Sequence, residues 1–186
     1  MPDPRTDRSR RRLHDALVAL ILERGWDRVT VRAVCQRARV GRSTFYLHFA
    51  DKEDCLVGGL EHVRDDLTRH SRVSDDRTGS GQLMRIRGEP FAFVHGLIAH
   101  ADASRRLFRA VIGKRSGLAV QRRFREIVLE LMTASLGAKA SPQLARFLSG
   151  ALVEMLFGWV DGKDASRAAD VEREFVRLAS RVAGHR

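Results

Sequence analysis

Six side chains that can donate hydrogen bonds to phosphates or base edges stand close together near the N-terminus. They are Arg42, Ser43, Thr44, Tyr46, His48 and Lys52. Three aromatic rings, at positions 45, 46 and 49, lie among them, in a chain with only 9 Phe, 1 Tyr and 2 Trp. Phe45 and Phe49 are four residues apart, so on a helix they share one face. The spacing predicts a short helix that is anchored on one side and presents polar groups on the other.

The charge of the chain favours a polyanionic partner. The 186 residues carry a formal net charge of +11, and residues 1–52 hold 12 Lys and Arg against 6 Asp and Glu, more than half of that excess. Such a surplus favours nucleic acid or an anionic membrane surface. No run approaches 18 apolar residues, so we expect no membrane span. The charged N-terminus is not a secretory signal, and Cys35 and Cys55 lack metal-ligand spacing, which favours a cytoplasmic protein with reduced thiols.

The first 70 residues predict four helices. Apolar residues at Leu13, Leu17 and Leu20 follow a helical period that begins after a cap at Thr6 or Asp7 and ends at Gly25. Thr30 is placed to cap a second short helix over 31–38, and a third runs from about Arg42 to Phe49. Asp51 caps a fourth helix that extends to about residue 70, with Asp54 at the capping-box position. The second and third helices form a helix-turn-helix.

The rest of the chain is also helical by its periodicity. Residues 71–90 are polar and predict a loop, and helices follow over about 91–102, 104–112, 118–136, 141–160 and 166–183. Ser141 and Pro142 mark a helix start. The predicted fold is all-α with about nine helices. We expect a three-helix DNA-binding head with a basic arm over residues 1–51, and a helical body over 52–186.

The segment RGWDRVTVRAVCQRARVGRSTFYLHFADKEDCL, residues 24–56, resembles the DNA-binding domain of the tetracycline-repressor (TetR) family of bacterial transcriptional regulators. The matching features are Thr-Val at the start of the second helix, the Thr-Phe-Tyr-x-His-Phe core and the Asp-Lys-Glu that follows. The likeness covers about residues 13–60. The turn departs from the family's usual Ala-Gly-Val-Ser, because here it reads Ala38-Arg39-Val40-Gly41. Arg39 therefore has to adopt a backbone conformation that favours glycine.

The resemblance implies a set of DNA-contacting residues. Arg42 reaches a guanine edge, Ser43 and Leu47 sense bases or a thymine methyl, and Thr44, Tyr46 and His48 donate to phosphates. Thr30 and Lys52, at helix N-termini, also meet phosphate, and Arg32 completes the set. Arginines at 5, 8, 10, 11 and 12 form an arm, ordered only on DNA, that adds salt-dependent affinity. For Thr44, Tyr46 and His48 a purely structural role is the alternative, and for Lys52 the alternative is an ordinary surface lysine.

The resemblance also implies an effector pocket and a dimer interface in the body. The predicted effector-lining residues are Phe91, Val94, His95, Phe108, Phe124, Met132 and Trp159. Few charges fall on the inward helix faces, which favours a small apolar or aromatic effector. Helix 141–160 is apolar on two sides, so a second copy of the chain is expected to cover it together with helix 166–183. The predicted interface residues are Phe147, Gly150, Ala151, Val153, Glu154, Phe157, Phe175 and Leu178. Plain core packing is the alternative for both sets.

Nothing in the sequence predicts catalysis. No glycine-rich phosphate loop, Ser-His-Asp set or metal-ligand cluster is present, and His95 and His100 are five residues apart, which does not suit ligation on one helix face. We expect no enzyme activity, no cofactor and no metal. The leading hypothesis is a homodimeric repressor that binds a palindromic operator in double-stranded DNA and is released by its effector. The rivals are a non-specific architectural DNA binder and a ligand-binding or enzymatic protein with a vestigial head.

Overall fold

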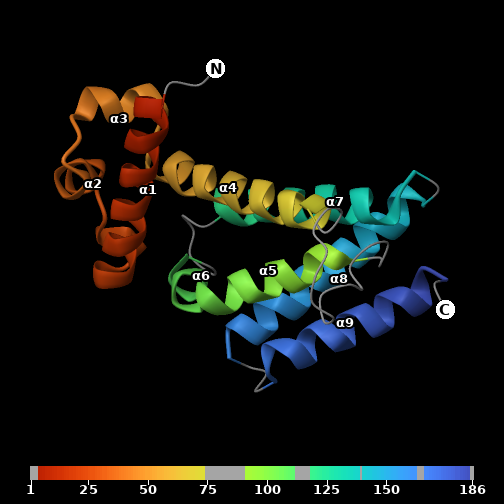
Figure 1. Ribbon diagram of the computed structural model, residues 1–186. Helices are drawn as coiled ribbons and strands as arrows, with labels where there is room; N and C mark the ends of the chain where they lie inside the picture. The colour runs from red at the N-terminus through yellow and green to blue at the C-terminus, as the bar shows by residue number, and fades with distance from the viewer. Residues whose placement is uncertain (1–3, 74–90, 112–117, 139, 163–165, 185–186) are drawn as a thin grey trace, which may run out of the picture. The chain divides into compact units, whose positions relative to one another are not determined.

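The computed structural model describes residues 4–73, 91–111, 118–138, 140–162 and 166–184, and every regular element in these ranges is a helix. The predicted all-α fold is therefore confirmed. In chain order (Figure 1) the elements are α1 (Pro4–Arg24), the 3-10 helix η1 (Trp26–Arg28), α2 (Val31–Ala38), α3 (Arg42–His48), α4 (Lys52–Val73), α5 (Ala92–Ala103), α6 (Arg105–Val111), α7 (Leu118–Leu136), α8 (Pro142–Val160) and α9 (Ala168–Val182). Over these ranges no helix has the length and apolar character needed to cross a bilayer.

The described residues form two compact units. The head unit lies within Met1–His62 and Arg106–Arg123, and the body unit lies within Val63–Arg105 and Phe124–Arg186. This division differs from a single cut after residue 51, because α6 and the start of α7 are grouped with the helix-turn-helix. Leu107, Ala110 and Val111 of α6 contact the apolar core of the head unit. The periodicity of a helix says which of its faces is buried but not which partner buries it.

The core of the head unit is built on α1, α2 and α3, which pack together (Figure 1). Its largest fully buried side chains are Leu13, Leu17, Leu20, Ile21, Trp26 and Phe45. Gly25 ends α1 with a φ of 78°, a conformation that glycine adopts without strain. Each fully buried side chain of this size contributes about 1.5–3 kcal/mol to stability. The predicted inward face of α1 is confirmed.

The start of α1 corrects one prediction. The helix begins at Pro4, not after a cap at Thr6 or Asp7, so the arginines of the expected arm lie within α1. Proline suits a first helical turn, and arginine is a good helix former. Arg10 lies over the Phe49 ring at 5.3 Å, and Arg12 donates from Nη2 to the carbonyl of Ala38 at 2.6 Å. These contacts replace the expected disorder of the arm, while Arg8 and Arg11 remain exposed.

The body unit contains α5, α8 and α9, which lie side by side (Figure 1). Ser141 caps α8 by accepting a hydrogen bond from Leu144 N at 3.1 Å, and Pro142 follows in the first turn, as predicted. The Phe91 and Phe175 rings meet edge to face with centroids 6.0 Å apart. The expected loop over 71–90 begins inside α4, which reaches Val73, and the remainder lies outside the described residues.

Candidate nucleic-acid interface

The inner faces of α2 and α3 hold the helix-turn-helix against α1. Val34, Cys35 and Ala38 of α2 are buried, and Phe45 of α3 has no exposed surface. Phe49 follows α3 and is also buried, with its ring centroid 5.8 Å from that of Phe45. Two rings one helical turn apart are enough to fix the orientation of a seven-residue helix. The predicted anchoring role of these two phenylalanines is confirmed.

The outer face of α3 is exposed and carries most of the predicted contact residues. Leu47 is 82% exposed and Tyr46 is 52% exposed, which is unusual for large apolar and aromatic side chains. Arg42 and Ser43 are exposed, whereas Thr44 and His48 are half-buried at the edges of this face. The Tyr46 ring meets Phe45 edge to face at 5.4 Å, which restrains it without burying it. Exposed Leu and Tyr beside an arginine make a surface suited to base edges and phosphates.

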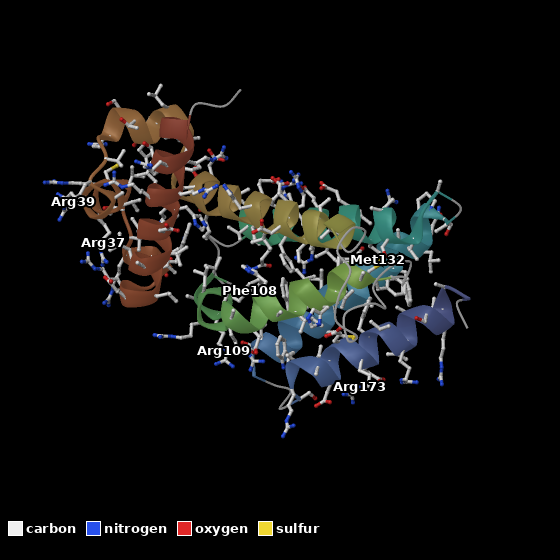
Figure 2. All side chains as sticks on the ribbon, in the orientation of Figure 1. Arg37, Arg39, Phe108, Arg109, Met132 and Arg173 are labelled. Carbon is white, nitrogen blue, oxygen red and sulfur yellow. The ribbon has the colours of Figure 1, made fainter. Side chains whose placement is uncertain are left out.

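The turn between the helices has the conformation that the sequence predicts. Arg39 ends α2 at φ 54° and ψ 46°, in the left-handed region. Val40 N donates to Cys35 O at 3.0 Å and Arg39 N donates to Gln36 O at 3.3 Å, which is the Schellman pattern of a helix C-terminus. Figure 2 shows Arg39 on the side of α2 that faces away from α1. A residue in this conformation costs about 1–2 kcal/mol unless it is glycine.

The predicted contacts on α2 are of two kinds. The Thr30 hydroxyl accepts a hydrogen bond from Ala33 N at 3.2 Å, so it acts as the expected N-cap, although its side chain remains exposed. Arg32 is exposed in the first turn of α2. Arg37, five residues later, donates from Nη2 to both oxygens of the Glu23 carboxylate of α1. Arg32 is therefore available to an external partner, while the charge of Arg37 is balanced within the head.

Lys52 has a structural role that the sequence did not reveal. Its Nζ donates to Trp26 O at 3.0 Å and to Val29 O at 2.9 Å, and it lies 4.5 Å from the centroid of the Trp26 ring. Two of its three donors thus bind backbone carbonyls of the η1 segment, 23 and 26 residues away in sequence. The neighbouring cap is as predicted, since Asp54 N donates to Asp51 Oδ1 at 2.7 Å. The Asp54 carboxylate accepts in return from Ala50 N at 2.9 Å, one residue before the expected donor.

The residues predicted to line an effector pocket do not form one set. Phe91, Val94, Phe124, Met132 and Trp159 are buried within the body unit. Phe108 is half-buried and belongs to the head unit. The assignment of His95 was wrong, because its side chain is 70% exposed and its Nδ1 lies 3.0 Å from Glu172 Oε2. His95 follows buried Val94 in the sequence, but its side chain projects from the outer side of α5 towards Glu172 of α9.

The residues predicted at a dimer interface also divide. Phe147 is 63% exposed and Leu178 is 42% exposed, with Gly150 and Glu154 also at the surface. Ala151 and Phe157 are half-buried. The Phe157 ring stacks on Phe124 at 5.8 Å. Val153 and Phe175 are only 2% exposed within the single chain, so assigning them to an interface was wrong. Both are core residues because α5, α8 and α9 cover them.

Comparison with known proteins agrees with this architecture. Residues 13–57 match the sequence model of bacterial regulatory proteins of the tetR family. No curated protein sequence matches the chain significantly. Among solved structures, a protein described as a TetR-family transcriptional regulator from Syntrophomonas wolfei has a TM-score of 0.69 at 17% identity, with 95% of each chain covered.

Two further structures have the same fold. A TetR transcriptional regulator from Streptococcus agalactiae has a TM-score of 0.58 at 20% identity, covering 94% of this chain and 95% of that one. The regulator FadR from Bacillus subtilis, solved in complex with stearoyl-CoA, has a TM-score of 0.55 at 16% identity, covering 91% and 96%. Residues 13–57 therefore carry a DNA-binding sequence of the tetR family, and the chain has the all-helical fold of solved TetR-family regulators.

Proposed function

We propose that this DNA-binding regulator is a homodimeric repressor that binds a palindromic operator and is released by a small apolar or aromatic effector. The observation that carries the proposal is the two-sided construction of α3. One side is fixed by fully buried Phe45, and the other exposes Arg42, Tyr46 and Leu47. A helix held in this way can enter the major groove as a rigid reader of base edges.

The proposed contacts follow from the chemistry of each exposed group. Arg42 makes a bidentate pair with guanine, and Ser43 and Leu47 contact neighbouring bases or a thymine methyl. Thr44, Tyr46 and His48, at the edges of the same face, donate to phosphates, as do Thr30 and Arg32 of α2. Lys52, the first residue of α4, is also among the proposed contacts. With two donors bound to backbone carbonyls, its contribution to DNA affinity comes mainly through the shape of the head.

Homodimerisation is supported by exposed apolar side chains on the last two helices. Phe147 of α8 and Leu178 and Val182 of α9 are each more than 40% exposed. Exposed large apolar residues on adjacent helices are typical of an interface between copies of a chain. Two copies place two α3 helices on one duplex, which gives the operator its palindromic form. Gly150 and Glu154 lie on the exposed surface of α8 and complete the proposed interface.

The proposed effector site lies in the body unit. Phe124, Met132 and Trp159 are buried there, and Arg105 lies over the Trp159 ring at 4.1 Å. A mainly apolar interior favours an apolar effector. The Bacillus subtilis FadR, whose fold is similar, was solved with stearoyl-CoA, whose acyl chain is apolar. Effector binding is proposed to shift α4, change the separation of the two α3 helices in the dimer and so release the operator.

The test is selection of binding sites from a random duplex library by the purified full chain, followed by gel shift against the region upstream of its own gene. We expect one enriched palindrome and a salt-sensitive shift. Arg42→Ala is expected to reduce discrimination at one base pair per half-site by about 1–3 kcal/mol. Arg173→Ala, on exposed α9 in the body unit, removes the same charge and should leave base preference unchanged.

The rival functions predict different results. An architectural DNA binder would bind the enriched and scrambled duplexes with equal affinity. A ligand-binding or enzymatic protein with a vestigial head would bind or turn over a small molecule without measurable affinity for DNA. The absence of both enrichment and a salt-sensitive shift would refute the proposed function.

A further inference from the structure

A groove of about 470 Å³ opens on the surface of the head unit between α2 and α3. It is lined by Arg32, Cys35, Gln36, Arg39, Val40, Gly41 and Arg42. Three of these seven residues are arginines and none is acidic. The arginines come from the first turn of α2, from the turn that ends it and from the start of α3. The fold therefore gathers onto one concave surface three positive charges that are up to ten residues apart.

In the described part of the chain these three arginines share one groove without an internal counterion. Within the described residues, the side chains of Arg32, Arg39 and Arg42 make no ion pair or hydrogen bond. Other arginines are paired with carboxylates, as Arg37 is with Glu23 and Arg123 is with Glu61. Three like charges that are gathered without a counterion repel one another, so the arrangement favours an anion supplied from outside the chain.

The backbone determines that Arg39 belongs to this groove. Its left-handed conformation turns the chain sharply between α2 and α3, and the bond from Val40 N to Cys35 O holds that turn closed. The side chain is exposed and lies on the side of α2 that faces away from α1 (Figure 2). Glycine or asparagine would adopt this conformation with less strain, and either would leave the groove with two arginines.

We propose that this groove is a phosphate cradle and that Arg39 is a DNA-binding residue, holding the DNA backbone beside the base contacted by Arg42. The inference rests on the proposed function, because it needs a duplex bound to α3. Arg42 both lines the groove and begins α3, so the cradle is continuous with the reading surface. A guanidinium matches a phosphate with two parallel hydrogen bonds. Phosphate contacts of this kind fix the register of a protein on its duplex without reading sequence.

The experiment measures how the affinity of the full chain for DNA depends on salt. The probes are the duplex enriched by the wild-type protein and the unselected random library. Removing one phosphate contact makes the slope of log K against log salt shallower by about 0.9 for each bound head. If both proteins bind alike at 1 M salt, Arg39→Gly therefore binds about eightfold more weakly per head at 0.1 M salt. Base preference should stay that of the wild type.

Three companion variants make the result specific. Arg39→Asn also tolerates the left-handed conformation and should lose the same slope, whereas Arg39→Lys keeps the charge and should retain it. Arg37→Gln, two residues away, removes a charge that Glu23 already balances and should change the slope less than Arg39→Gly does. Urea unfolding should show that Arg39→Gly is as stable as the wild type or more stable, which excludes misfolding as the cause of weaker binding.

Two outcomes would overturn the cradle without touching the proposed function. The first is a wild-type salt slope for Arg39→Gly while Arg42→Ala loses its base preference. The second is saturable binding of inorganic phosphate, lost in Arg39→Gly, with an unchanged slope on DNA, which would make the groove a small-anion site. By contrast, failure of the wild-type chain to enrich any duplex would count against the proposed function itself.

Discussion

Replacing Lys52 with methionine should destabilise the head unit more than it disturbs direct contact with DNA. The ammonium donates to Trp26 O at 3.0 Å and Val29 O at 2.9 Å, and it lies 4.5 Å from the Trp26 ring centroid. Methionine keeps an unbranched stem of similar length but removes the donors and the charge. The η1 segment would then lose its connection to the first residue of α4.

The expected loss in the free energy of unfolding follows from these contacts. A hydrogen bond to a charged group contributes about 1.5–3 kcal/mol, and a cation–π contact adds about 0.5–1 kcal/mol at a partly exposed site. Lys52 is half-buried, so the lower ends of both ranges apply. Trp26 O also accepts from Val29 N at 3.2 Å, so it keeps one partner in the variant. We therefore expect Lys52→Met to lower the free energy of unfolding by about 3 kcal/mol.

Urea unfolding followed by Trp26 fluorescence is the direct assay. The chain has two tryptophans, so a Trp159→Phe background leaves Trp26 as the reporter of the head unit. With a urea dependence of about 1 kcal/mol per molar for a small unit, the midpoint should fall by about 3 M. Arg32→Met is the matched control, because its side chain makes no ion pair or hydrogen bond in the described part of the chain.

An unchanged unfolding midpoint in Lys52→Met would refute the structural role of Lys52. If the same variant instead showed a shallower salt dependence of DNA binding, Lys52 would be a phosphate contact and its carbonyl bonds would be incidental. An equal loss of stability in Arg32→Met would also contradict the argument, because the effect would then follow from net charge.

Three further outcomes are expected. In Gly59→Ala the added methyl would overlap the His14 ring. Despite the greater helix propensity of alanine, we expect the free energy of unfolding to fall by about 1 kcal/mol. A urea-unfolding double-mutant cycle should show that this loss is recovered when His14→Ala is combined with Gly59→Ala. Burial lowers the pKa of His14 below its usual 6.5. The unfolded chain therefore binds more protons, and the stability of the head is lost as the pH falls through 6.5. Urea midpoints between about pH 7.5 and 5 should depend less on pH in His14→Gln, and a wild-type pH dependence in that variant would contradict the assignment. Phe147→Asp should weaken dimerisation at least 30-fold in analytical ultracentrifugation with an unchanged circular dichroism spectrum, and a wild-type dimer would remove α8 from the interface.

Prediction from sequence succeeded where a few adjacent residues determine the outcome. The caps at Thr30, Asp51 and Ser141 are short side-chain-to-backbone bonds within three residues, so their sequence signals are sufficient. The left-handed conformation of Arg39 agrees with the resemblance, which has glycine at this position of the turn. In the same way, the four-residue spacing of Phe45 and Phe49 determines which side of α3 is exposed.

Prediction failed where the partner of a side chain is distant in sequence. The structural role of Lys52 could not be predicted, because its carbonyl partners lie 23 and 26 residues earlier. His95 was assigned to the effector pocket because its partner, Glu172 of α9, lies 77 residues away in sequence and could not be anticipated.

The sequence by itself therefore determined that the chain is helical, where its capped helices start, and that a basic helix-turn-helix lies near its N-terminus. These properties depend on backbone propensity, capping and periodicity, which act over one or two helical turns. The tertiary structure alone decided that α6 contributes to the core of the head unit, that Val153 and Phe175 are interior, and that three arginines share one groove. Burial and the gathering of charge depend on which helix faces meet, and that is a property of the folded chain as a whole.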